Sequence, residues 1–217
     1  MVEFALISGI LFLFIAGIFD FGRAIFILEE LGTAANEGAR QAILSYDQLS
    51  NNTSNGCVNP NLTTCQTYGV MPTIKKYAGY AVTLNYQDST STCAPPATAT
   101  YTPPTSGSPY QPGTISLVDP TPNQAYVYIY EIGPSFNSQS AHPDNCAPAA
   151  TNYTYWPCEN GDSSGCSNVD VVRQGGFNYA VVDIKYAWKP FFGILLPFLP
   201  NNGIVVLDAT STYQMEY

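Results

Sequence analysis

The sequence predicts an α+β fold in which a long N-terminal hydrophobic helix packs on a small antiparallel β-sheet with long, disulfide-braced loop insertions. Two observations predict this fold. The chain begins with an uninterrupted apolar run that passes into an amphipathic helical pattern. Further along, short segments of alternating apolar and polar residues are typical of strands, and the Pro-, Ser-, Thr- and Asn-rich loops between them contain all 6 Cys.

The first element is a predicted helix over residues 1–46, because no Pro occurs before Pro60. Residues 4–19 are all apolar or small. At about 1.5 Å per residue they are roughly 24 Å long, close to the hydrocarbon thickness of a bilayer. We therefore expect residues 1–24 to lie in a membrane or among other copies of the chain. Residues 25–46 carry an apolar stripe and a polar side, and we expect this half to pack on the sheet.

A cleaved signal peptide is the main alternative for the apolar run. Such a peptide has basic residues before the apolar stretch and a small-residue cleavage site after it. Here acidic Glu3 precedes the stretch, and Asp20 and Arg23 follow it. We therefore expect the apolar segment to be retained.

Residues 47–217 are predicted to form a β head. A short helix is expected over residues 73–80, and strands are expected over residues 80–86, 125–131, 177–188 and 204–213. In the second strand three Tyr alternate with Val and Ile, so the two sets should face opposite sides of the sheet. These residues are Tyr126, Val127, Tyr128, Ile129 and Tyr130. Two long insertions are expected, over residues 88–124 and 133–172, and the first, which is rich in Pro, Ser and Thr, should be extended.

The cysteines predict an exported head. An even number of Cys in polar loops, with no C-x-x-C pair and a single His, favours disulfides over a zinc site. Two C-x7-C spacings favour local bridges, which leaves one longer bridge. The expected pairs are Cys57–Cys65, Cys158–Cys166 and Cys93–Cys146. The sequence leaves other pairings of 6 Cys open.

The composition excludes several classes of function. The net charge is −9 and only 11% of residues are charged, so the clustered basic charge that nucleic-acid binding needs is lacking. The sequence contains no G-x-S-x-G, HExxH or phosphate-binding glycine loop, and its one His is flanked by Pro143 and Asp144. We expect no enzymatic activity, no cofactor and no metal. A calcium loop around Asp162 and Asp170 is the weaker alternative, since the EF-hand pattern is absent.

Short motifs at both ends carry a family resemblance. The helix contains VEFAL at residues 2–6, DFGRA at residues 20–24 and AANEGAR at residues 34–40. Near the C-terminus, residues 181–200 read VVDIKYAWKPFFGILLPFLP. Together these segments resemble the tight-adherence pilin-like proteins, the TadE/TadG family within the type IV pilin superfamily. The resemblance leaves residues 47–175 unexplained.

The resemblance implies a structural subunit, or pilin, of an extracellular pilus-like filament. Its expected partners are copies of itself in a helical filament, prepilin peptidase and the membrane assembly machinery. The precursor would lie in the inner (cytoplasmic) membrane before extraction into a cell-surface filament. A minor tip pilin or pilus assembly factor, and a surface adhesin held by a membrane anchor, are the alternatives.

Six residues of the helix are candidate assembly residues: Glu3, Phe4, Asp20, Arg23, Glu37 and Arg40. The resemblance implies that Glu3 pairs with the N-terminal ammonium of a neighbouring subunit. Its alternative role is a helix-start carboxylate favoured by the helix dipole. The four other charged residues are spaced i, i+3, which predicts ordinary intrahelical ion pairs unless they lie in a filament core.

Four N-x-S/T sequences make the head a candidate glycoprotein. The acceptor residues would be Asn51, Asn52, Asn61 and Asn152. Such sequences also arise easily in a chain so rich in Asn and Thr.

Overall fold

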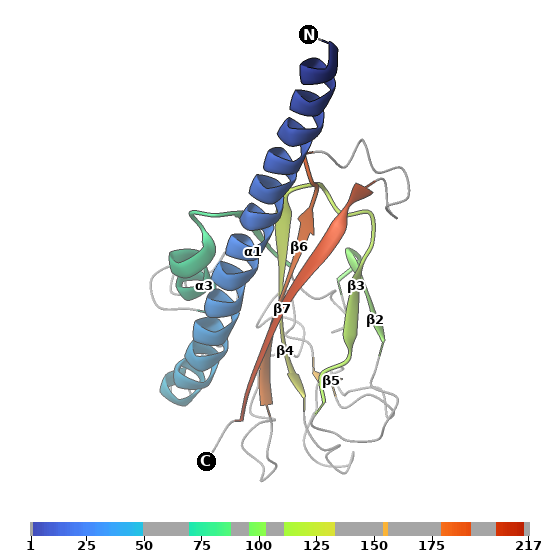
Figure 1. Ribbon diagram of the computed structural model, residues 1–217. Helices are drawn as coiled ribbons and strands as arrows, with labels where there is room; N and C mark the ends of the chain where they lie inside the picture. Colours follow the sequence, from blue (N-terminus) through green and yellow to red (C-terminus); the bar gives the residue numbers. More distant parts are fainter. Residues whose placement is uncertain are drawn as a thin grey trace.

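The apolar run at the N-terminus and the amphipathic segment after it form one continuous helix. The computed structural model describes residues 2–49, 70–87, 96–102, 111–132, 154–155, 179–191 and 203–214. Helix α1 runs from Val2 to Leu49, roughly 70 Å at the usual rise per residue. The sheet lies beside only its second half, so the first half projects beyond the rest of the molecule (Figure 1). The predicted long helix is confirmed, and it ends three residues later than the expected residue 46.

A short second helix packs beside α1. Helix α3 runs from Val70 to Ala78 and buries Val70, Met71, Ile74 and Ala78. It begins three residues earlier than predicted and includes Pro72 in its first turn. Backbone N–H groups in the first turn have no acceptor within the helix, so Pro is tolerated there. At its end the backbone N–H of Gly79 donates to the carbonyl oxygen of Lys75 at 2.9 Å.

The main sheet has five strands, and it is mixed rather than antiparallel. Its order is β1-β4-β6-β7, with β5 pairing β4. The strands are β1 (Thr83–Tyr86), β4 (Gln124–Ile132), β5 (Thr154–Tyr155), β6 (Tyr179–Trp188) and β7 (Val205–Gln214). The prediction of an antiparallel sheet was wrong for one pair, because β1 runs parallel to β4. A long connection separates these two strands, and it lets the chain re-enter the sheet in the same direction.

The first insertion contains a second, smaller sheet that the sequence did not predict. Strand β2 (Ala99–Thr102) pairs antiparallel with β3 (Thr114–Leu117). The sequence predicts an extended segment here but gives no strand pairing. Its apolar residues, led by buried Ile115, instead pack on the main sheet. Each of the two strands is only four residues long, and the Pro- and Gly-containing segment between them makes their alternation hard to recognise in the sequence.

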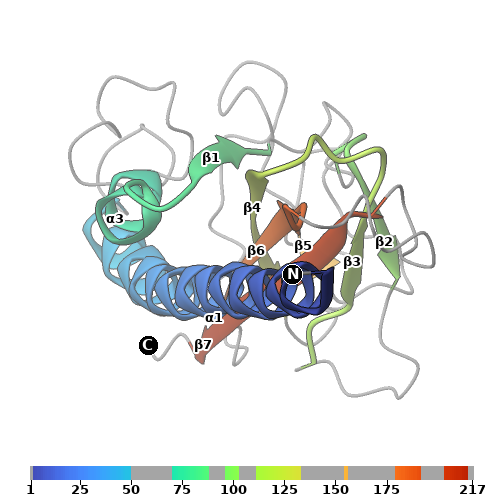
Figure 2. The same ribbon diagram turned by 45° about the horizontal axis from the view of Figure 1, so that its top comes forward.

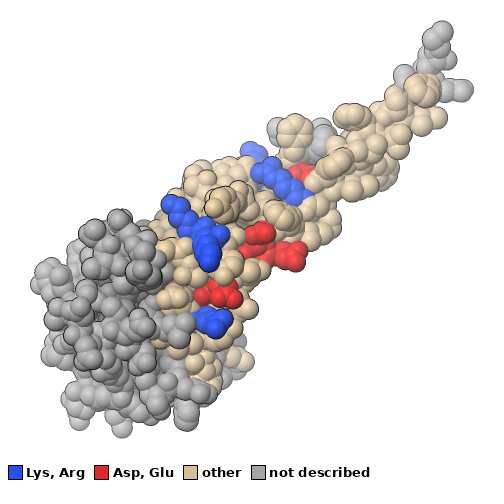
Figure 3. Space-filling model, turned by 90° about the vertical axis from the view of Figure 1, so that its left-hand side faces the viewer, with Lys and Arg blue, Asp and Glu red and all other residues tan. Residues whose placement is uncertain are grey.

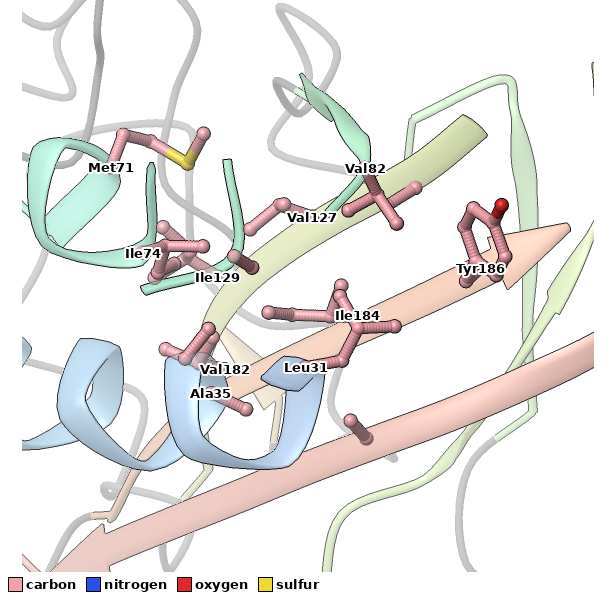
Figure 4. Close-up of a cluster of buried hydrophobic side chains, with 14 of the residues drawn as sticks. Leu31, Ala35, Met71, Ile74, Val82, Val127, Ile129, Val182, Ile184 and Tyr186 are labelled. Atoms are coloured by element: carbon pink, nitrogen blue, oxygen red, sulfur yellow. The ribbon is translucent and has the colours of Figure 1, made fainter. Parts of the chain in front are cut away.

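The two faces of the main sheet are covered differently. Helices α1 and α3 cover one face, and the β2–β3 ribbon lies over the other (Figures 1 and 2). On the helical face, aliphatic side chains of α1, α3, β4 and β6 point toward one another (Figure 4). They include Leu31, Ala35, Met71, Ile74, Val127, Ile129, Val182 and Ile184. This packing holds the second half of α1 rigidly to the head.

The opposite face is built from tyrosines. Tyr126, Tyr128 and Tyr130 lie there with Val181 and Ala187, and Tyr130 packs edge-on against Tyr101 of the ribbon. The predicted alternation in β4 is therefore confirmed. Burial raises the pKa of Tyr128 to about 12 and also raises the pKa of Tyr130. Both phenols thus stay neutral and function as large core residues with a polar tip.

Candidate functional site

The most unusual surface of the molecule is the projecting half of α1. Phe12 is 74% exposed and Phe19 is 76% exposed. Their large apolar neighbours from Phe4 to Phe21 are exposed as well, on every side of the helix. Figure 3 shows no charged side chain on the described part of this projection, whereas charges of both signs lie farther along the molecule. A helix that is apolar all round is stable only in lipid or among other apolar helices.

The second half of the same helix behaves differently. Leu31 is fully buried, and Ala34, Ala35 and Ala39 lie with it against the sheet and α3. The change from exposed to buried begins at Ala24 and Ile27. Residues 7–43 are long and apolar enough to cross a membrane by length and composition, but from Ala24 onward the helix also buries side chains against the head. The described side chains of the helix are therefore mostly exposed before Ala24 and partly packed on the head after it.

A comparison with protein-family models identifies this helix. Residues 1–40 match the model described as TadE-like protein. The N-terminal segment is TadE-like. The match covers 40 of 217 residues, and residues 2–40 of it lie in α1. Comparisons with curated proteins and with solved structures return no match. The similarity is thus confined to the N-terminal helix, whose apolar half has the length and composition of a membrane-spanning segment.

Asp20 of the TadE-like segment holds the loop that follows β6. Its Oδ2 accepts a hydrogen bond from the backbone N–H of Phe191 at 2.8 Å. The helical spacing predicted an Asp20–Arg23 pair, with a contact between subunits as the alternative, and the ion pairs among the described residues do not include Asp20–Arg23. The two segments that carry the family resemblance are therefore joined directly. No local pattern reveals this contact, because the two residues are 171 positions apart.

The other polar residues of the TadE-like segment make local or supporting contacts. Glu37 and Arg40 form the i, i+3 ion pair that their spacing predicted, at 4.0 Å on the surface. Asn36 Oδ1 accepts a hydrogen bond from the Ser211 hydroxyl of β7 at 3.1 Å. Glu3 and Phe4 both lie in the first turns of α1, and Phe4 is exposed. The predicted pairing of Glu3 involves a second chain, so it stays a prediction.

The predicted head modifications fall outside the described residues. This holds for the bridges Cys57–Cys65, Cys93–Cys146 and Cys158–Cys166, and for Asn51, Asn52, Asn61 and Asn152. The alternative calcium loop around Asp162 and Asp170 also falls outside. Within the described ranges, no group of three or more His, Cys, Asp and Glu side chains could hold a metal ion.

A buried ionic cluster on the tyrosine face was missed by the sequence analysis. Lys185 of β6 contacts Asp208 of β7, its direct partner in the strand register, and its Nζ lies 3.3 Å from Asp183 Oδ2. Asp183 and Lys185 are almost fully buried, whereas the Asp208 side chain is 53% exposed. Burial raises the pKa of Asp183 to about 7; Lys185 opposes this rise and Asp208 adds to it. The alternating pattern in β6 could have revealed that both charges point into this face.

A polar cavity of about 560 Å³ lies between strand β1 and the start of β4. Its amide and hydroxyl groups are bonded to one another. Asn85 Nδ2 donates to Gln124 Oε1 at 2.9 Å, and Thr98 Oγ1 donates to Gln87 Oε1 at 2.7 Å. These bonds join β1 to β4 and to the residues before β2, so the cavity lining has a structural role.

Proposed function

We propose that this chain is a structural subunit, a pilin, of an extracellular pilus-like filament rather than an enzyme. Its N-terminal helix would anchor the precursor in the membrane and would later pack with helices of other copies in the filament. The observation that carries this proposal is the projecting half of α1, apolar on every side, on a segment that matches TadE-like proteins.

The physical argument is the cost of leaving this surface in water. Burying apolar surface stabilises by about 25 cal/mol per Å², and each large side chain contributes roughly 1.5–3 kcal/mol. More than ten large apolar residues are exposed between Phe4 and Leu28. Lipid covers them in the precursor, and other copies would cover them in a filament. Lipid and neighbouring helices both remove these apolar side chains from water, so the same helix can serve in a membrane intermediate and in a filament.

Glycines on the projecting helix support packing among copies. A Cβ added at Gly9, Gly17 or Gly22 would meet nothing within 4 Å in the single chain. Gly17 and Gly22 lie in a shallow apolar groove that Leu13, Phe14, Ile18 and Phe21 also line. Small residues at such positions let two helices approach closely in an apolar environment. These positions are thus suited to contacts that the single chain does not make.

The test is a chain that lacks residues 1–19. The deletion keeps Asp20, Ala24 and every α1 residue that packs on the sheet. We expect a soluble, folded monomer that gives no filaments in cells that carry the assembly machinery. Circular dichroism and size-exclusion chromatography measure folding and association, with the full chain in detergent as control. Incorporation of the truncated chain into filaments of normal appearance would contradict the proposal.

The full chain distinguishes the proposed role from its alternatives. Sheared surface fibres in which this chain is the main protein, repeated helically in electron micrographs, would support a major subunit. A few copies at the fibre end would indicate a minor tip pilin or assembly factor. A chain that stays in the membrane and is absent from fibres would instead indicate an anchored adhesin and would contradict the filament proposal.

A further inference from the structure

One end of the sheet lies at the level where the apolar run of α1 ends. Asp20 lies about 27 Å along the helix from Val2, close to the thickness of the bilayer hydrocarbon. At this level the backbone of Phe191 binds the Asp20 carboxylate. The β6–β7 register places Trp188 and Val205 at this end of the sheet, and Tyr179 and Gln214 about 30 Å away at the other end.

The side chains exposed at this level have the chemistry of a membrane interface. Phe191 is 81% exposed, although its backbone is held by Asp20. Lys189 is half-buried two residues before it, and Arg23 is exposed one turn of helix after Asp20. An exposed aromatic ring and cationic side chains, just outside an apolar segment, suit the headgroup layer of a bilayer with anionic lipids.

The distribution of charge strengthens this assignment. The chain has 16 acidic residues and only 7 Lys and Arg. An anionic bilayer surface would therefore repel most of the head, and it would attract the head where Arg23 and Lys189 are found. The Asp20 carboxylate at the same level already accepts a hydrogen bond from the backbone. The local balance thus favours one orientation of the head on the bilayer.

We propose that, before assembly, the head rests on the membrane through a headgroup-level contact made by Arg23, Lys189 and Phe191. This inference rests on the proposed membrane-inserted precursor. The contact adds a second membrane attachment to the helix. Asp20 joins this contact to the inserted helix through its bond to Phe191, so the two attachments together fix the tilt and rotation of the head relative to the bilayer. The partner is the phospholipid headgroup layer, and anionic lipid strengthens the contact through the two cations.

The test measures the depth of single Trp probes in vesicles. The background is the full chain with Trp156→Phe and Trp188→Phe, which removes both native Trp. The probes are Phe191→Trp at the proposed contact, Phe12→Trp in the apolar helix and Gln214→Trp at the far end of the sheet. Each is reconstituted into phosphatidylcholine vesicles, with or without phosphatidylglycerol, that contain lipids brominated near the carbonyl group or near the chain end.

We expect bromine near the chain end to quench the Phe12→Trp probe most. Bromine near the carbonyl should quench the Phe191→Trp probe most, and more strongly with phosphatidylglycerol. The Gln214→Trp probe should be quenched by neither. Adding Arg23→Gln and Lys189→Gln should remove most of the extra quenching that phosphatidylglycerol gives the Phe191→Trp probe. Near-ultraviolet circular dichroism checks that each variant is folded.

The outcomes separate this inference from the function on which it rests. If the Phe12→Trp probe is quenched and the Phe191→Trp probe behaves like the Gln214→Trp probe, the helix inserts but the head makes no contact, and the inference is overturned. If the Phe12→Trp probe is not quenched either, the membrane-inserted precursor itself is wrong.

Discussion

Two charged residues of this protein, Asp183 and Lys185, are buried, so favourable contacts must offset the free-energy cost of removing their charges from water. Asp183 and Lys185 lie inside the tyrosine face, where an unpaired charge would cost several kcal/mol. Their mutual contact and the contact of Lys185 with Asp208 offset part of this cost. Because Lys185 and Asp208 are direct partners in the register, a slip of β7 would separate them. We interpret the cluster as a device that selects one register for the two C-terminal strands.

The raised pKa of Asp183 predicts an unusual pH dependence of stability. Asp183 has a pKa of about 7 in the folded chain, against an ordinary value of 3.8. Between these values the unfolded chain has lost the proton while the folded chain keeps it. The contribution of Asp183 to the free energy of unfolding therefore decreases from about pH 4 to about pH 7. In Asp183→Asn this contribution is absent, so the variant should gain stability relative to wild type as the pH rises.

Urea denaturation at about pH 4 and about pH 8 measures this difference. Asp119→Asn is the matched control, because Asp119 is an exposed turn residue with φ of 44° that Asn also tolerates. The control should keep the wild-type pH dependence. A constant difference between Asp183→Asn and wild type at both pH values would show that Asp183 is ionised in the fold.

Helix α1 has two parts with different surroundings: an exposed apolar part and a part packed on the head. Its first half contributes no side chain to the core of the head, and its second half is packed between the sheet and α3. Gly38 lies directly against α3, since a Cβ there would lie 2.6 Å from Ile74 Cγ1. Gly32 is on the same helix, but a Cβ there would meet nothing within 4 Å. The same residue type is thus a packing requirement at one position and is not needed for packing at the other.

This contrast predicts opposite effects of the same substitution. Gly38→Ala should lower the free energy of unfolding by about 1–3 kcal/mol, because Ile74 is fully buried and has little room to move. Gly32→Ala should raise it by up to about 1 kcal/mol through helix propensity. Chemical denaturation of the head that lacks residues 1–19 measures both. Equal effects of the two substitutions would show that the α1–α3 contact is looser than the structure indicates.

The whole molecule is divided between a projection with exposed apolar side chains and a head with its own buried core. The head buries two clusters on opposite faces of one sheet, and neither cluster includes a residue before Ile27. The proposed transfer of the projection from lipid to a filament would therefore leave the core of the head undisturbed. The link between the two parts is short, and it consists of the continuous helix and the Asp20–Phe191 bond.

At this scale Glu3 is the residue expected to set the register between subunits. In a filament core a lone carboxylate or ammonium would cost several kcal/mol, and pairing Glu3 with a neighbour's N-terminus lowers both costs. A one-turn slip would separate the pair by about 5.4 Å. Glu3→Ala should give normal amounts of membrane-inserted chain but few or no fibres, measured by membrane fractionation and by counting sheared fibres.

Glu29→Ala is the control for this prediction, because Glu29 is an exposed acidic residue on the same helix beyond the apolar run. It should leave fibre abundance close to wild type. Fibres of wild-type abundance and helical spacing from the Glu3→Ala chain would remove the registry role and leave Glu3 as a helix-start carboxylate.

Local patterns in the sequence determined the elements of this protein. The apolar run without Pro produced the long helix, and the alternation in residues 125–131 placed Tyr and aliphatic side chains on opposite faces of β4. Strand bounds near the C-terminus were predicted to within two residues. These features depend on periodicities within one segment, so neighbouring residues alone specify them. The TadE-like motifs are also local, since they lie on one helix.

Only the tertiary structure decided which elements meet. The parallel pairing of β1 with β4, the β2–β3 ribbon and the burial of Asp183 depend on residues that are distant in the chain. The same holds for Asp20, whose helical spacing indicated an i, i+3 partner, whereas the folded chain brings Phe191 to it. The hydrogen-bond donor that reaches the Asp20 carboxylate depends on how the helix packs on the sheet, and this packing is determined by the whole core. The sequence therefore determined the membrane-length helix, and the fold decided which end of the head lies beside it.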